Sequence, residues 1–238
     1  TTIYGATGLQ FVPTGDISED QDFGVSASAS MDNDPSVHTS MRGAWLEHRL
    51  EIALANTWAM VDNDSSGFRP RTTSGFPIVP SIKYVLDHDG SSWQSWSYAV
   101  GFSMPYGVYG AVTWALELPL LSPSITAGMG TPIKTFHTFG GARLDLCDLD
   151  GNRLPVSLLA DASYGGSTRT LGESAEAFWA VGVSTAVGRN LTFRAFHRRD
   201  RSYDAPPAWQ NPGTSYLQLA WNFDGVKVAA KHPLETKQ

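Results

Sequence analysis

Large apolar residues alternate with small or polar ones along most of this chain, and that alternation limits the folds open to it. From Ser95 to Met104, alternate positions carry Trp96, Tyr98, Val100, Phe102 and Met104, and the positions between them carry Ser, Ala or Gly. Alternation at period two is typical of β-strands, and sustained helical spacing is almost absent. The pattern predicts about twelve strands, over 21–32, 36–46, 49–60, 78–88, 95–106, 108–118, 123–133, 134–147, 154–165, 175–188, 191–201 and 214–224.

The non-apolar face of these segments indicates which side of the sheet is inside. A soluble strand usually shows Lys, Glu, Arg and Thr to water, whereas here that face is dominated by Ser, Ala and Gly, as in Ser26, Ser28 and Ser30. Small residues suit the interior of a narrow barrel whose large apolar residues face lipid. The predicted fold is therefore all-β, a closed antiparallel transmembrane β-barrel of about 12 strands. A soluble β-barrel or sandwich with a Trp-rich core is the alternative.

Charged and aromatic residues on these strands predict where the barrel meets water and lipid. A Lys or Arg on the lipid face would cost about 2–4 kcal/mol at the midplane, so we expect the charges on the small face to line the lumen. These lumen-facing candidates are Glu51, Lys83, Glu117, Arg143, Asp145, Asp161, Arg194 and Arg198. Aromatic residues near strand ends are expected at the membrane interfaces: Trp45, Trp58, Trp96, Tyr106, Trp114, Trp179, Trp221 and Phe223.

Loop lengths and the chain ends complete the expected organisation. Short turns at 47–48, 148–152 and 188–190 alternate with long connections at 61–77, 166–174 and 202–213, as in bacterial outer-membrane barrels, although Pro105–Gly107 is too tight for its side. We expect an N-terminal segment over 1–20, the barrel over 21–224 and a tail over 225–238. Leu217–Phe223 should close the barrel against 21–32. The chain starts at Thr1 without Met, which suggests a processed, secreted precursor.

The opening residues, Tyr4-Gly5-Ala6-Thr7-Gly8-Leu9-Gln10-Phe11-Val12-Pro13-Thr14-Gly15, resemble the start of YjbH-like outer-membrane barrels. Shorter matches follow in the order that this family uses, at 49–54, 80–86, 98–101 and 139–144. The resemblance implies an exported barrel in the outer membrane of a diderm bacterium, associated with exopolysaccharide production or secretion. It carries no catalytic residues. One departure is that Leu217–Phe223 looks like the aromatic ending of such barrels, yet fifteen more residues follow it.

Composition and scattered polar residues exclude several other functions. Lys and Arg total 17 against 23 Asp and Glu, and the net charge of -6 argues against a nucleic-acid partner. Cys147 is the only cysteine, and the six histidines show no metal-ligand spacing, so no metal or cofactor is expected. Turn chemistry explains the acidic segments 32–34, 62–64 and 148–152 more simply than calcium binding.

Two functions follow for a membrane barrel, and neither is enzymatic. The first is a porin-like pore or export-associated barrel, linked to exopolysaccharide secretion. The second is a structural or assembly barrel with a plugged lumen, which packs against copies of itself or another envelope protein. Both place the chain in the lipid bilayer of the bacterial outer membrane.

Overall fold

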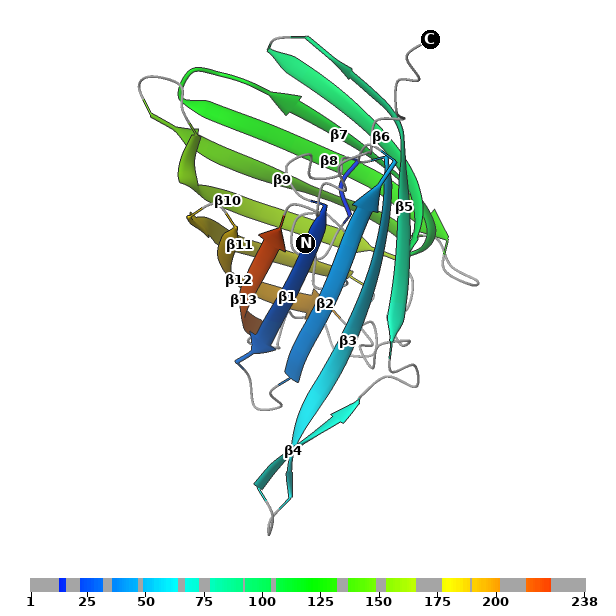
Figure 1. The fold of residues 1–238 in the computed structure, drawn as a ribbon, viewed down its shortest axis with the longest axis vertical. Coiled ribbons are helices and arrows are strands. Elements are labelled where there is room, and N and C mark those ends of the chain that lie inside the picture. The colour runs from blue at the N-terminus through cyan, green and yellow to red at the C-terminus, as the bar shows by residue number, and fades with distance from the viewer. Residues whose placement is uncertain are drawn as a thin grey trace, which may run out of the picture.

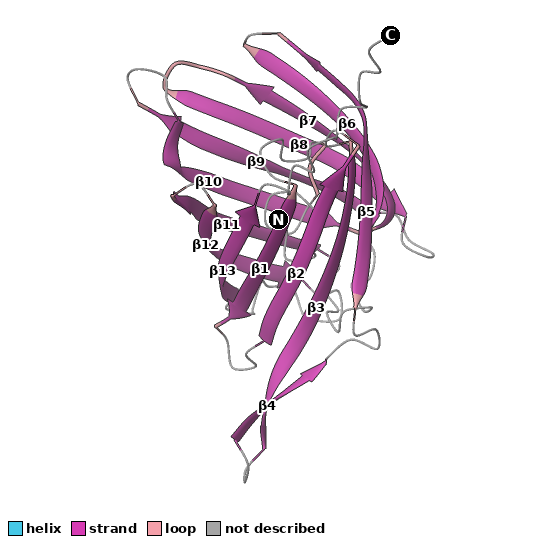
Figure 2. Cartoon of the chain, viewed as in Figure 1, coloured by secondary structure: helices cyan, strands magenta, loops and turns pink. Residues whose placement is uncertain are grey.

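The computed structural model of the chain describes residues 13–15, 22–31, 36–46, 49–63, 67–72, 78–91, 93–103, 106–131, 137–148, 153–165, 177–188, 190–201 and 213–223. The regular elements within these ranges are all strands (Figure 2). They are β1 (Phe23–Ser30), β2 (Ser36–Trp45), β3 (Leu50–Asn63), β4 (Gly67–Thr72), β5 (Val79–Gly90), β6 (Gln94–Ser103), β7 (Gly107–Leu116), β8 (Leu121–Thr131), β9 (His137–Cys147), β10 (Arg153–Tyr164), β11 (Ala177–Val187), β12 (Leu191–Arg201) and β13 (Thr214–Phe223). No described helix is long and apolar enough to cross a membrane.

Antiparallel pairing closes these strands into a ring (Figure 1). Neighbours in sequence pair from β5 through β13, and β13 then pairs with β1 in a register that runs from Phe23↔Phe223 to Ser30↔Tyr216. β1 pairs with β2, β2 with β3, and β3 with β5, which completes the circle. The predicted closed antiparallel barrel and its closing strand at Leu217–Phe223 are both confirmed.

β4 is the one described strand outside the ring, because β3 is longer than the sequence pattern predicts. The first part of β3, Leu50–Ala55, pairs with β5, while its extension Trp58–Asn63 pairs with β4. The β3–β4 ribbon therefore projects beyond the barrel wall (Figure 1). This corrects the expectation of an unstructured connection over 61–77. The ring itself holds twelve strands, since the thirteen-stranded sheet includes β4.

Side-chain burial follows the pattern expected of a membrane barrel rather than a soluble one. In β1, Ser26, Ser28 and Ser30 are buried, whereas the alternate residue Val25 is exposed. In β13, Gln218 is 2% exposed and Leu219 is 49% exposed. In these two strands, small and polar residues thus lie inside and apolar residues outside, the arrangement that lipid stabilises.

The two ends of the barrel differ in their connections. The end where β1 begins and β13 ends, here called the short-turn end, also carries the turns that join β2 to β3, β5 to β6 and β11 to β12. The opposite, long-loop end carries the connections β10–β11 and β12–β13, together with the β3–β4 ribbon. β6 and β7 are joined tightly at the long-loop end, where Gly107 adopts a φ of 65° that favours glycine.

Candidate functional site

Most of the expected lumen residues lie on the inner face of the barrel. Glu51, Lys83, Asp145, Asp161 and Arg198 are all buried, with exposures between 0 and 6%. Arg194 is half-buried on β12, two positions from the buried Phe196 and therefore on the same inner face. Arg143 also falls on the inner series of β9, yet its side chain is 45% exposed. Space accessible to solvent therefore exists inside the barrel beside β9.

Glu117 does not reach the lumen. β7 ends at Leu116, one residue before it, and Glu117 lies exposed in the turn that leads to β8. Its backbone N–H donates to the carbonyl oxygen of Trp93 at 2.9 Å, which ties this turn to the neighbouring one at the short-turn end. The expectation that Glu117 lines the lumen is therefore wrong, because the strand is shorter than its apolar alternation suggested.

A buried ionic cluster joins three neighbouring strands on the inner wall. Glu51 of β3 lies 3.4 Å from Nη1 of Arg42 on β2 and 3.9 Å from Nζ of Lys83 on β5. Arg42 also donates from Nη2 to Oδ1 of Asn222 on β13 at 3.3 Å. Sequence reasoning missed Arg42, although it continues the inward series of His38 and Ser40 on β2 and could have been found from that register.

Two arginines on well-separated parts of the wall lie near Arg194. Arg194 of β12 lies within electrostatic range of Arg42 on β2 and Arg143 on β9. Three steps around the ring separate β2 from β12, and three more separate β12 from β9, so β2 and β9 are on opposite sides. Nearby carboxylates balance part of this charge: Asp161 lies within electrostatic range of Arg194, Glu51 contacts Arg42, and Asp145 accepts from Nε of Arg143 at 2.7 Å. Basic groups, each with a carboxylate nearby, therefore lie on different sides of the lumen.

Aromatic side chains occupy the inner face toward the long-loop end. Buried members of this cluster include Tyr106, Tyr109, Phe139, Phe178, Phe196 and Tyr216. Phe196 and Tyr216 stack with ring centroids 5.0 Å apart, and the guanidinium carbon of Arg198 lies 4.5 Å from the centre of the Phe178 ring. At this end, aromatic rings together with the buried Arg198 therefore line the interior.

Tyr106 corrects one of the expected interface positions. It is 1% exposed and packs against Phe139, with ring centroids 4.8 Å apart, and edge-on against His137. The tight connection before β7 places this ring inside the barrel rather than at the lipid boundary. The carbonyl of Tyr106 comes so close to Gly130 that a Cβ there would overlap it. Tyr106, in the connection that is too short for its side of the barrel, therefore points inward.

The other expected interface aromatics lie on the outer face where the structure describes them. Trp45, Trp96, Trp114, Trp221 and Phe223 gather toward the short-turn end, where Trp96 stacks on Trp114 at 5.7 Å. Trp179 lies near the opposite end of the barrel, on β11. The side chain of Trp58 is outside the described residues. Anchoring at the membrane surface remains a prediction for these residues.

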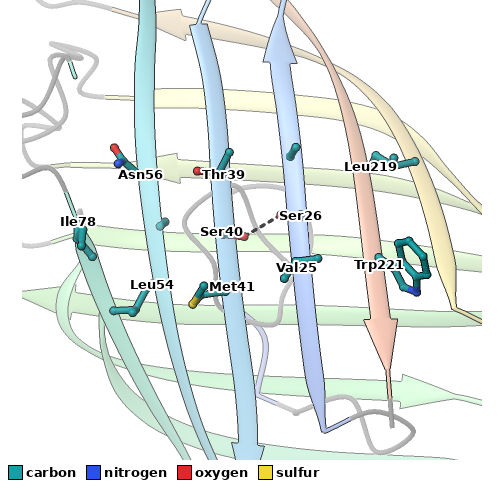
Figure 3. Close-up of a pocket in the computed structure, with 12 residues that line it drawn as sticks. Val25, Ser26, Thr39, Ser40, Met41, Leu54, Asn56, Ile78, Leu219 and Trp221 are labelled. Atoms are coloured by element: carbon teal, nitrogen blue, oxygen red, sulfur yellow. Dashed lines mark hydrogen bonds between the residues drawn. The ribbon is translucent and has the colours of Figure 1, made fainter. Parts of the chain in front are cut away.

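An apolar groove of 580 Å³ runs along the outside of β13, β1, β2 and β3 (Figure 3). Outward side chains line it, among them Val25, Met41, Leu54, Leu219 and Trp221. The hydroxyls of Ser26 and Ser40 meet at 2.7 Å on the inner side of the same strands. This groove faces the lipid and is separated from the lumen by the sheet.

Within the described ranges, no group of three or more His, Cys, Asp or Glu side chains is placed to hold a metal ion. The acidic segments 32–34, 62–64 and 148–152 lie wholly or partly outside those ranges.

Comparison with known proteins identifies the fold. No family model matches the sequence, and no curated protein matches it. Among solved structures, the chain is similar to the KdgM porin, with a TM-score of 0.51 and 10% identity over 84% of this chain and 99% of that one. A structure of the KdgM porin in complex with disordered oligogalacturonate matches with a TM-score of 0.50, at 10% identity and the same coverage of both chains. At such identity the likeness concerns the fold alone. A closed barrel of this kind with an apolar outer face is the fold of bacterial outer-membrane proteins, and that is where this chain resides.

Proposed function

We propose that this barrel is a channel that passes small anionic solutes across the outer membrane. The observation that supports this most is that Arg42 and Arg143, on opposite sides of the interior, are each within electrostatic range of Arg194, and that the Arg143 side chain is accessible to solvent. Positively charged side chains in a confined lumen raise the local concentration of anions and lower the energy barrier to anion entry. The channel is therefore expected to carry anions in preference to cations.

Carbohydrate acids are the solute class that we favour. A twelve-stranded barrel encloses a modest lumen, because diameter grows with strand number, so a single extended oligosaccharide chain suits it better than a folded macromolecule. Planar carboxylates are also the groups that arginine binds in bidentate fashion. The resemblance to YjbH-like barrels would connect such solutes with exopolysaccharide secretion, and that connection is part of the proposal.

Reversal potentials in planar lipid bilayers test this function directly. The purified barrel is expected to give stepwise currents and, under a KCl gradient, a reversal potential of the sign produced by chloride preference. Arg194→Gln should reduce that preference. Arg49→Gln is the matched control, because Arg49 is exposed in the turn between β2 and β3. Cation preference, equal effects of the two variants or the absence of current from a folded barrel would each contradict the proposal.

A structural barrel with a filled lumen is the second candidate, and it rests on a separate observation. Lys83 and Arg198 are completely buried, and the aromatic cluster leaves Tyr106 and Tyr109 only 1% and 2% exposed. Side chains packed this closely could close the lumen and leave the outer surface for contacts with other envelope proteins. Silence in bilayers from a correctly folded barrel would favour this function over the channel.

A further inference from the structure

Part of the chain ahead of the first strand lies inside the barrel. The described residues Pro13, Thr14 and Gly15 are all buried, although they precede β1 and belong to no wall strand. The backbone N–H of Gly15 donates to Oγ1 of Thr113 on β7 at 2.7 Å. Nζ of Lys83 on β5 donates to the Thr14 carbonyl oxygen at 3.4 Å. Both partners are on the buried face of their strands, so this segment lies on the lumen side of the wall.

The wall is shaped to receive this segment closely. A Cβ on Gly15 would overlap the carbonyl oxygen of Ser97 on β6 and would lie 2.9 Å from the backbone nitrogen of Thr113. Backbone atoms cannot move aside as a flexible side chain would, so only glycine allows this approach. Thr113 is itself fixed by a 2.8 Å hydrogen bond to Thr126 on β8. Residues from four adjacent strands, β5 to β8, thus build the docking site.

The segment also meets the ionic cluster of the lumen. Lys83, which holds the Thr14 carbonyl, is the residue whose Nζ lies 3.9 Å from Glu51, and Glu51 in turn contacts Arg42. A stretch of backbone lying on the inner wall reduces the open cross-section of a lumen that twelve strands already make narrow. The segment is therefore attached to the wall beside this buried cluster and leaves the solute path between itself and the opposite wall.

We propose that Pro13–Gly15 forms part of the channel constriction, so that its attachment to the wall sets the conductance. This rests on the proposed channel function. The segment takes up part of the barrel cross-section, and the width left between it and the opposite wall limits the flow of ions and solutes. Loosening the segment should widen this passage without altering the strands of the barrel.

Two substitutions test the attachment from opposite sides. Gly15→Val adds a side chain where the wall has no room, and Thr113→Val removes the hydroxyl that accepts from Gly15 while keeping the shape of the residue. Each is expected to raise single-channel conductance in planar bilayers by about twofold, as a wider lumen would. Retained folding is checked by the shift in gel mobility between heated and unheated samples.

Each variant has a matched control. Gly110→Val is also a Gly-to-Val change, on β7, but the nearest atom to a Cβ there is 4.0 Å away. Thr126→Val removes the same hydrogen bond between Thr113 and Thr126 that Thr113→Val removes, yet leaves the Thr113 hydroxyl for Gly15. Both controls should conduct as the parent chain does. If Gly15→Val fails to fold, the comparison of Thr113→Val with Thr126→Val decides.

The outcomes separate this inference from the function it rests on. The constriction is supported if conductance rises in Gly15→Val and Thr113→Val but not in the two controls. It is also supported if Gly15→Val gives current when the parent chain gives none. If the parent chain conducts and the test variants conduct equally, the constriction is refuted and the channel stands. Silence from every folded variant refutes both.

Discussion

Replacement of Glu51 by Gln tests whether the ionic cluster is truly dry. The change keeps the size of the side chain but removes the carboxylate that contacts Arg42 at 3.4 Å and Lys83 at 3.9 Å. With an effective dielectric constant of about 20, these separations correspond to attractions of about 5 and 4 kcal/mol. The cost of burying the charges offsets part of this. Since Arg42 and Lys83 would stay buried without their counter-charge, we expect a net loss of about 3–5 kcal/mol in the free energy of unfolding.

Asp145→Asn is the matched control. From distance alone, this variant would be expected to lose more stability than Glu51→Gln. Asp145 accepts from Arg143 at 2.7 Å, a shorter contact than either made by Glu51. The Arg143 side chain is 45% exposed, however, and can be hydrated when its partner is lost. Asp145→Asn should therefore lower the free energy of unfolding by no more than about 1 kcal/mol.

Equilibrium unfolding in urea, with the barrel refolded in lipid vesicles and tryptophan fluorescence as the signal, measures both variants. The expected loss for Glu51→Gln corresponds to a roughly 10²–10⁴-fold change in the unfolding equilibrium constant. A loss below about 1 kcal/mol for Glu51→Gln would refute this reasoning, because it is the value of a hydrated pair.

Two further predictions concern the closing strand and the tail. Leu219→Arg, on the outer face in the middle of β13, should lower the free energy of unfolding by about 2–4 kcal/mol in the same assay. Trp221→Arg, nearer the short-turn end, should lower it by about 1 kcal/mol or less. Equal losses would mean that β13 does not cross the membrane in this orientation. Truncation after Gly225 should leave folding in detergent intact by gel mobility, because the last pair of β13 with β1 is Phe23↔Phe223; loss of folding would make the tail part of the barrel, and the tail itself lies outside the described residues.

The alternation of apolar with small or polar residues predicted the strands of the ring. It could do so because each residue of the wall faces either lipid or lumen. The Ser-rich face of β1 and the apolar face of β13 could both be assigned in this way. β4 could not, since Gly67–Thr72 contains Pro and charged residues, and among the described strands its partner is an extended β3. A ribbon beyond the wall does not separate lipid from lumen, so its residues need not alternate between apolar and polar.

Contacts inside the lumen were harder to predict, because they join residues that are distant in sequence. Pairing of Arg42 with Glu51 depends on the register of β2 with β3, and the approach of Arg194 depends on closure of the whole ring. The aromatic character of Tyr106 suggested a lipid interface, but an inward turn gave it a buried partner instead. Nothing in the composition of Pro13–Gly15 distinguishes a segment that leads to the barrel from one that lies within it.

The two candidate functions differ in where water penetrates the interior, so stability and conductance can be read together. A large loss for Glu51→Gln with clear conductance would place the solute path along the opposite wall, beside the hydrated Arg143 side chain. A small loss with conductance would mean that water fills the ionic cluster as well, and Lys83 would then be in direct reach of solutes. A large loss with no conductance would describe a barrel whose interior is a polar core, in which opposed charges specify how the wall closes. Conductance therefore decides between a channel and a scaffold, and the loss for Glu51→Gln then shows whether the cluster of Arg42, Glu51 and Lys83 borders the solute path.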